Sequence, residues 1–184
     1  MNRNFNGIKS SKKNGFTLIE LLVVLAIFAV LYIAFGDKVN NTFASNDNQT
    51  EVDNITMIIT GAKGLKSTVG YPDANMVPAL IDIKQVPSSM TITGAAAARK
   101  IFNQWGGEVS IAGAQTDKTT YLVTDRSVPK DACIRMVSSM TKGGLIKSTN
   151  INAKGARIGE VTTVQSSADC DQATNNTIAY IIQG

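Results

Sequence analysis

The sequence predicts an α+β fold in which one long N-terminal helix, hydrophobic at its start, packs on a head built around an antiparallel β-sheet. An unbroken apolar run opens the helix, apolar residues return at helical spacing further on, and segments with the two-residue alternation of strands follow. We divide the 184 residues into a polar leader (1–15), the helix (16–69) and the head (70–184).

The positive charge of the chain is concentrated in the leader. The chain has 18 Lys and Arg against 14 Asp and Glu, and four of the basic residues precede Phe16: Arg3, Lys9, Lys12 and Lys13. Without these four, basic and acidic side chains are equal in number. The head has no basic patch with aromatic residues between, so we expect no nucleic-acid partner. A basic leader before an apolar run predicts that the N-terminus stays in the cytoplasm and that the head is exported.

The apolar run at residues 16–35 is long enough to span a bilayer. Its 20 residues of helix, at about 1.5 Å each, match the hydrocarbon thickness of about 30 Å. No A-x-A-like cleavage site follows it, so its length alone fits an uncleaved single-pass anchor. Glu20 is the exception in this run, because a carboxylate at mid-membrane costs roughly 2.5–3.5 kcal/mol. In an ordinary anchor, Glu20 would lie at the level of the lipid headgroups.

The residues around the start of this run resemble the signal of type IV prepilins. KKNG followed by FTLIELLVVLAIFAVL combines a basic leader, Gly15, an apolar Phe16 and, four residues later, Glu20. The resemblance implies that a prepilin peptidase cuts after Gly15 and that the same enzyme methylates the Phe16 amine. It also implies a helical filament of identical subunits, whose helices pack in a core with little water. Because an unpaired charge there is costly, we expect Glu20 to pair with the Phe16 amine of a neighbour and to set the axial register.

The second part of the helix is expected to pack on the head. Val52, Ile55, Ile59 and Ala62 lie on one helical face, which continues to Leu65 and Val69. Gly61 and Gly64 interrupt this stretch, and each weakens a helix by about 1 kcal/mol relative to Ala. They mark either close packing against the head or a frayed helix end.

Three further helices are expected in the head. A short one begins at Pro78, and a second runs through GAAAARKIFNQW, residues 94–105. The third is entered near Pro129 and stopped by Gly143 and Gly144. Its buried face is expected to contain Cys133, Met136, Val137 and Met140.

Strands are expected in the second half of the head. Val109 and Ile111 alternate with polar residues, as do Tyr121 and Val123, and a turn over residues 113–118 would join the two segments in a hairpin. Two further strands are expected at 157–164 and 176–183.

The tripeptide WGG, residues 105–107, precedes the first strand of this hairpin. It resembles the head of type IVb pilins, including those of conjugative thin pili. The alternative is that Trp105 only anchors a hairpin against the core. Phe16 as the first mature residue departs from this branch, since it is more typical of type IVa pilins.

Cys133 and Cys170 both lie on the side of the membrane where oxidation is expected, so we predict a disulfide. Closing that loop is worth roughly 4 kcal/mol in the chain-entropy relation. Free buried thiols or a metal site are the alternatives. The resemblance implies that residues 133–170 form the D-region, a variable surface that meets neighbouring subunits.

The sequence offers no candidate catalytic residues and no metal or cofactor site. Without a single His, a Ser/His/Asp or Cys/His system is impossible, and phosphate-binding and dinucleotide-binding motifs are missing. The remaining carboxylates are scattered singly and are expected at the solvated surface, among them Asp37, Asp53, Asp73, Asp125 and Asp171. We therefore expect a structural protein and not an enzyme.

The resemblance implies a type IVb-like major pilin that is held in the inner membrane before assembly and lies in an extracellular pilus afterwards. The implied partners are the prepilin peptidase and methyltransferase, an assembly ATPase with an inner-membrane platform, an outer-membrane secretin, and minor pilins or a tip adhesin. The use would be adhesion, aggregation or the stabilisation of mating cells in conjugation. The alternatives are a minor pilin or a type II secretion pseudopilin, although no calcium loop is evident, and a membrane-anchored periplasmic enzyme or sensor domain.

Overall fold

The computed structural model of the chain describes residues 17–184, except for the side chains of residues 34–45. The chain divides into two compact units, one ending at Thr42 and one running from Phe43 to Gly184. Helix α1 (Leu18–Lys63) contributes to both. The second unit contains the head together with the last part of α1, and its architecture follows here.

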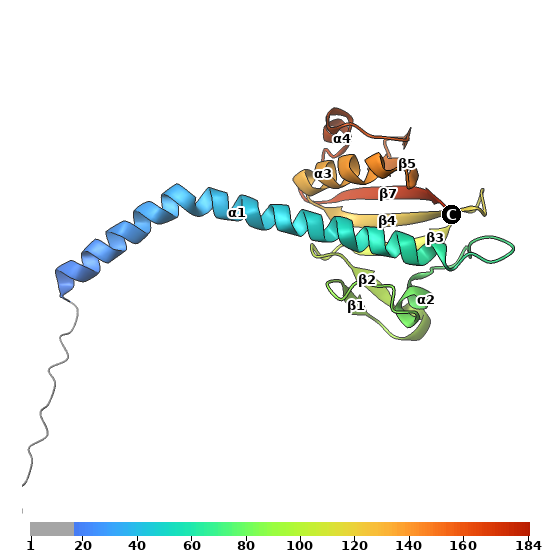
Figure 1. Cartoon of the computed structure of the whole chain (residues 1–184), viewed down its shortest axis with the longest axis horizontal. Helices are drawn as coiled ribbons and strands as arrows, with labels where there is room; N and C mark the ends of the chain where they lie inside the picture. Colours follow the sequence, from blue (N-terminus) through green and yellow to red (C-terminus); the bar gives the residue numbers. More distant parts are fainter. Residues whose placement is uncertain (1–16) are drawn as a thin grey trace, which may run out of the picture. The chain divides into compact units, whose positions relative to one another are not determined.

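The head is an antiparallel sheet with helices packed against it (Figure 1). The seven strands in the described part of the chain are ordered β1-β2-β3-β4-β7-β5-β6, and every pair of neighbours is antiparallel. The elements after α1 are α2 (Val77–Asp82), β1 (Thr91–Thr93), η1 (Ala96–Ala98), β2 (Lys100–Phe102), β3 (Glu108–Gly113), β4 (Thr120–Val128), α3 (Lys130–Met140), η2 (Thr141–Gly143), β5 (Ile146–Ile151), β6 (Ala156–Ile158), α4 (Thr163–Asp169) and β7 (Asn176–Gln183). This confirms the predicted α+β fold.

The predicted hairpin is formed by β3 and β4. Ile111 lies opposite Val123, and Val109 lies opposite Asp125. Val109, Ile111, Tyr121 and Val123 are all buried, as their alternation with more exposed neighbours predicts. The strand predicted at residues 176–183 is β7, which pairs with β4 on one side and β5 on the other.

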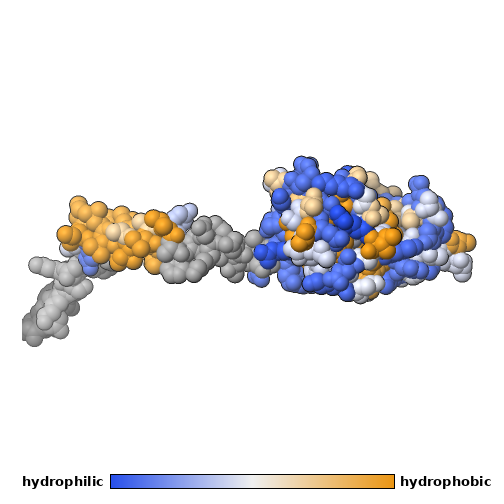
Figure 2. Space-filling view, turned by 90° about the horizontal axis from the view of Figure 1, so that it is seen from above, coloured by the Kyte–Doolittle hydropathy of each residue, from blue (hydrophilic) through white to orange (hydrophobic). Residues whose placement is uncertain are grey.

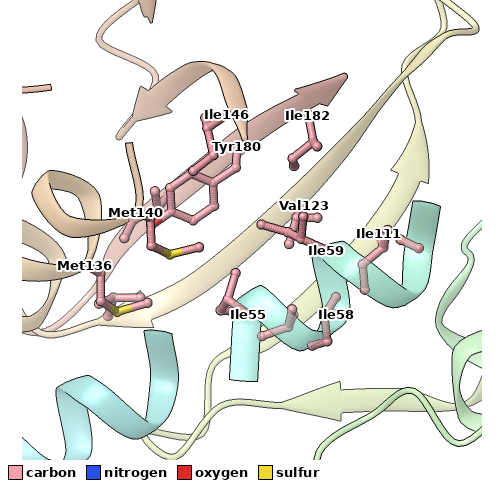
Figure 3. Close-up of a cluster of buried hydrophobic side chains, with 14 of the residues drawn as sticks. Ile55, Ile58, Ile59, Ile111, Val123, Met136, Met140, Ile146, Tyr180 and Ile182 are labelled. Carbon is pink, nitrogen blue, oxygen red and sulfur yellow. The ribbon is translucent and has the colours of Figure 1, made fainter. Parts of the chain in front are cut away.

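The core of the head lies between α1 and the sheet. Ile55, Ile58 and Ile59 are at most 1% exposed, and Figure 3 shows them beside side chains of the strands, Ile59 next to Val123. The Tyr121 hydroxyl donates a hydrogen bond of 2.6 Å to the Ile59 carbonyl, which satisfies the polar end of a fully buried ring.

Gly61 in α1 and Gly64 just after it have different roles. A Cβ at Gly61 would lie 2.6 Å from Cβ of Gln85, so Gly61 permits close packing. Gly64 instead follows the end of the helix. The helix ends at Lys63, six residues before the predicted end at Val69. The amides of Gly64 and Leu65 bond to carbonyls three residues back, which tightens the chain into a turn. Val69, predicted on the buried face, is 83% exposed.

The helix predicted over residues 94–105 is wrong. Only a single 3₁₀ turn, η1, forms over its alanines, and Ala96 has a positive φ of 48°. The chain then becomes β2, which pairs with β1 and β3 and buries Ile101 completely. The pairing of β2 between two strands overrides the helix propensity of the alanine run.

The strand predicted over residues 157–164 is also wrong beyond its first two residues. Strand β6 ends at Ile158, and Gly159 follows with a φ of 74°. A capping box between Thr162 and Gln165 then starts α4. Strand β5, which was not predicted, contains the polar run Lys147–Asn150.

The other predicted helices are confirmed. Helix α2 begins at Val77, directly before Pro78. Helix α3 begins after Pro129, and the chain leaves η2 through Gly144 in the left-handed conformation. The predicted inner face of α3 is buried, at Cys133, Met136, Val137 and Met140.

Replacing Ile59 by Ala should lower the free energy of unfolding by about 2–5 kcal/mol, because the change leaves a cavity between α1 and the sheet. Chemical denaturation of the full chain in detergent measures this. Val69→Ala is the control, because an exposed side chain should change the value by no more than about 0.5 kcal/mol. Equal losses in the two variants would contradict the described packing of α1.

Candidate functional site

Apart from Glu20, the first four turns of α1 are apolar on every side of the helix. The large apolar residues between Leu18 and Ile33 are exposed, Leu18 by 77% and Tyr32 by 81%, and Figure 2 shows hydrophobic residues covering this part of the helix. A helix that is apolar all round is typical of one covered by lipid or by other helices. Over the side chains that the structure describes, no helix is both long and apolar enough to cross a membrane. The predicted segment 16–35 extends beyond those side chains at both ends.

Glu20 takes part in a capping box at the start of α1. Its Oε2 accepts from the Thr17 backbone N–H at 3.4 Å, and the Glu20 N–H donates to the Thr17 hydroxyl at 3.3 Å. The carboxylate therefore lies at the positive end of its own helix. Gly15 and Phe16 lie outside the described residues, so the predicted pairing of Glu20 with the Phe16 amine stays a prediction.

A disulfide joins Cys133 in α3 to Cys170 at the end of α4, with 6.0 Å between the Cα atoms. Both cysteines are completely buried. The disulfide closes the region that holds α3, β5, β6 and α4, which we call the disulfide-bounded region (residues 133–170).

One ion pair lies within this region, and a second joins the region to Asp171, directly after Cys170. Arg157 on β6 pairs with Asp169 on α4, and its hydrogen bonds lower the pKa of that carboxyl. Lys154 pairs with Asp171 at 2.8 Å and lowers the pKa of Asp171 in the same way. The region thus presents a braced outer surface, on which Ile158 is 86% exposed.

The WGG tripeptide forms the turn between β2 and β3, which we call the WGG turn (residues 103–107). Asn103 organises it: its side-chain oxygen accepts the N–H groups of Trp105 at 3.0 Å and Gly107 at 2.6 Å. Gly106 has a φ of 78°, and a Cβ on Gly107 would overlap the Arg126 carbonyl, so the turn needs both glycines. Trp105 packs half-buried against the core, in agreement with the anchoring role considered from the sequence.

Two carboxylates are buried beside the WGG turn. Glu51 on α1 and Asp125 on β4 are both 0% exposed. The expectation that Asp125 lies at the solvated surface is therefore wrong: Asp125 follows Tyr121 and Val123 in the two-residue alternation of β4, so it faces the core. Glu51 precedes Ile55 by four residues and lies on the same buried face of α1.

Two models of known protein families match the chain. The model described as PilS N terminal matches residues 45–183, and the prokaryotic N-terminal methylation motif matches residues 10–32. The chain belongs to the PilS family of type IVb pilins. The pilin is thus a subunit of a type IV pilus, a homo-oligomeric assembly outside the cell, and its family is structural.

Solved structures have the same fold. The crystal structure of a type IVb pilin from Salmonella typhi has a TM-score of 0.64 and 23% identity, and the match covers 74% of this pilin and 99% of that chain. The NMR structure of the type IVb pilin PilS from Salmonella typhi has a TM-score of 0.52 and 26% identity over 75% and 97% of the two chains. The search of curated proteins found no match.

The structure brings together only some of the residues singled out in the sequence. The two cysteines meet, and Glu20 meets Thr17, whose role in the capping box was not predicted although the spacing T-x-x-E is visible in the sequence. In residues 17–33 and 46–184, no group of three or more Cys, Asp or Glu side chains is arranged to hold a metal ion.

Replacing both Cys133 and Cys170 by Ser should lower the free energy of unfolding of the pilin by roughly 4 kcal/mol, because the disulfide closes a loop with a sequence separation of 37. Denaturation of the oxidised wild type and of the double variant measures the difference. Treating the wild type with reductant should reproduce it, whereas the double variant should not respond to reductant. A reductant effect on the double variant, or none on the wild type, would contradict the pairing.

Proposed function

We propose that the pilin is the major subunit of its pilus, that residues 16–35 form the core of the filament, and that the subunit itself catalyses no reaction. The observation that carries this proposal is the exposed apolar surface at the start of α1. Burying one such side chain fully is worth about 1.5–3 kcal/mol. A helix covered by identical helices on all sides uses this whole surface, whereas contact on one side would leave most of it exposed.

Glu20 is the register-setting residue in this proposal. Leu18, Ile19, Leu21 and Leu22 surround it with apolar side chains, so its carboxylate enters a filament core at a large desolvation cost. A positive charge from a neighbouring subunit offsets this cost only where the axial offset is correct. The amine of Phe16, released by cleavage after Gly15 and methylated by the same peptidase, supplies that charge.

Assembly requires further proteins. Before assembly the pilin is held in the bacterial inner membrane through residues 16–35 with its head in the periplasm. An ATPase and inner-membrane platform add subunits to the filament, which leaves through an outer-membrane secretin with minor pilins or an adhesin at its tip. The resemblance of the WGG segment to pilins of conjugative thin pili supports the stabilisation of mating cells as the use, beside adhesion and aggregation.

Replacing Glu20 by Gln should abolish filament growth while leaving the subunit in the membrane. Gln keeps a side-chain oxygen for the capping box and removes only the charge. Thr17→Ala is the matched control, because it removes the capping hydroxyl and keeps the carboxylate. Electron microscopy and the amount of pilin in sheared surface material provide the measurement. Two results would show that capping and not charge pairing is the role of Glu20. One is normal pili from Glu20→Gln, and the other is a loss of pili in Thr17→Ala as large as that in Glu20→Gln.

Mass spectrometry of sheared surface pilin should show a chain that begins with N-methylated Phe16. Cleavage after Gly15 removes the four basic residues of the leader, which would otherwise have to enter the filament. Gly15→Leu should leave the whole leader on a chain confined to membranes. Surface pilin that still begins at Met1 would overturn the processing proposal and favour an uncleaved anchor.

A further inference from the structure

Glu51 and Asp125 are held by adjacent residues of the WGG turn. The Asn103 side chain donates to Oδ1 of Asp125 at 2.7 Å, and the backbone N–H of Gln104 lies near enough to the Glu51 carboxylate to lower its pKa. Because residues 103 and 104 are consecutive, the two carboxylates approach one turn from two elements, α1 and β4. The Gln104 side chain also donates to the Asp47 carbonyl, which attaches the same turn to α1 a second time.

The groups around this pair do not neutralise it. From α1, Asn54 donates to Glu51 at 3.3 Å, and Asn48 is buried nearby. From β7, Tyr180 is fully buried, and burial together with the charges of Asp125 and Glu51 raises the pKa of its hydroxyl well above the ordinary value. None of the ion pairs between described side chains includes either carboxylate, and the neighbouring Arg126 side chain is exposed.

Several polar atoms in this cluster have no hydrogen-bond partner among the described residues. They are Oε1 of Glu51, Oδ2 of Asp125, the Tyr180 hydroxyl and Nδ2 of Asn48. Two buried carboxylates without a counter-charge cannot both be ionised at an acceptable cost. Binding of one proton removes one of the two negative charges, and the protonated carboxyl becomes a hydrogen-bond donor for a neighbouring oxygen.

We propose that Glu51 and Asp125 together hold a proton that fastens α1 to the sheet through the WGG turn, and that loss of this proton loosens the fastening. With the proton bound, the pair is partly neutral and both sides of the WGG turn stay attached. Without it, two buried negative charges repel each other with no water to screen them. Because α1 and β4 contribute one charge each, their repulsion acts to separate the helix from the sheet. This fastening is a property of the head and does not rest on the proposed use of the pilus.

The direction of the titration follows from burial. Burial raises the pKa of Asp125 from 3.8 to about 8, and the negative charge of Glu51 adds to the effect. Burial also raises the pKa of Glu51. A carboxyl with a raised pKa in the folded state stabilises the fold below its ordinary value, and this stabilisation is lost as the pH rises through the folded value. The head should therefore lose stability at this site between about pH 4 and pH 8.

The pilin contains its own reporter for this site. Trp105 is the single tryptophan of the chain and lies in the WGG turn. We expect the tryptophan fluorescence of the full chain in detergent micelles to change in one step centred near pH 8. Asp125→Asn should remove this step, because an amide supplies a hydrogen-bond donor that does not titrate. Glu51→Gln should move the step to lower pH, because it removes the negative charge that adds to the effect of burial on Asp125. Asp53→Asn, an exposed carboxylate on the same helix, should keep it.

Two outcomes would overturn the proposal. One is a constant Trp105 fluorescence between pH 5 and pH 9.5, or an unchanged step in Asp125→Asn. The other is a step that appears only with added Ca²⁺ and disappears with a chelator, which would show that the carboxylates hold a cation and not a proton. Infrared spectroscopy of the wild type tests the proton directly and does not depend on the folding of any variant. It should show a protonated carboxyl at pH 6.5 that disappears with the same midpoint as the fluorescence step, and its absence would contradict the proposal.

Discussion

The head depends on the contact between one face of α1 and the sheet. Ile55, Ile58 and Ile59 are buried there with the inward side chains of β3, β4 and β7. An isolated sheet with one apolar face cannot exclude water from it, so the helix supplies the second layer that the fold requires. The same helix carries, at its start, an exposed apolar surface. One element therefore supplies both the core of the subunit and the surface available for assembly.

Periodicity predicted the elements in which local pattern and tertiary contact agree. Helix α3, the β3–β4 hairpin and β7 have apolar residues at the spacing of the element that forms. The pattern failed where the two disagree: residues 94–105 contain an alanine run that favours a helix, yet Ile101 is buried as part of β2. Strand β5 was missed because its run Lys147–Asn150 is polar, although its pairing with β7 orders it within the sheet.

The candidate sites likewise include some that the sequence predicted and some that it did not. The two cysteines were predictable, because export and a pair of cysteines suffice to suggest a disulfide. Glu51 and Asp125 were missed although each is in phase with buried neighbours, Glu51 four residues before Ile55 and Asp125 two residues after Val123. A carboxylate is ordinarily a surface residue, and only the fold shows that these two face inward. The proposed processing at Gly15 depends on a separate enzyme that recognises the sequence motif. The motif therefore predicts it, whereas the fold of the subunit carries no information about it.

The position of β7 determines when the head can fold. This strand, Asn176–Gln183, is the last in the described chain but lies in the middle of the sheet, between β4 and β5. Ile182 of β7 lies opposite Tyr121 of β4 on one side and Ile146 of β5 on the other. The two halves of the sheet therefore cannot join before β7 is present. During synthesis, β1 to β4 on one side and β5 with β6 on the other have no common partner until residues 176–183 leave the ribosome. Because synthesis starts at the N-terminus, the apolar start of α1 leaves the ribosome well before the head can fold.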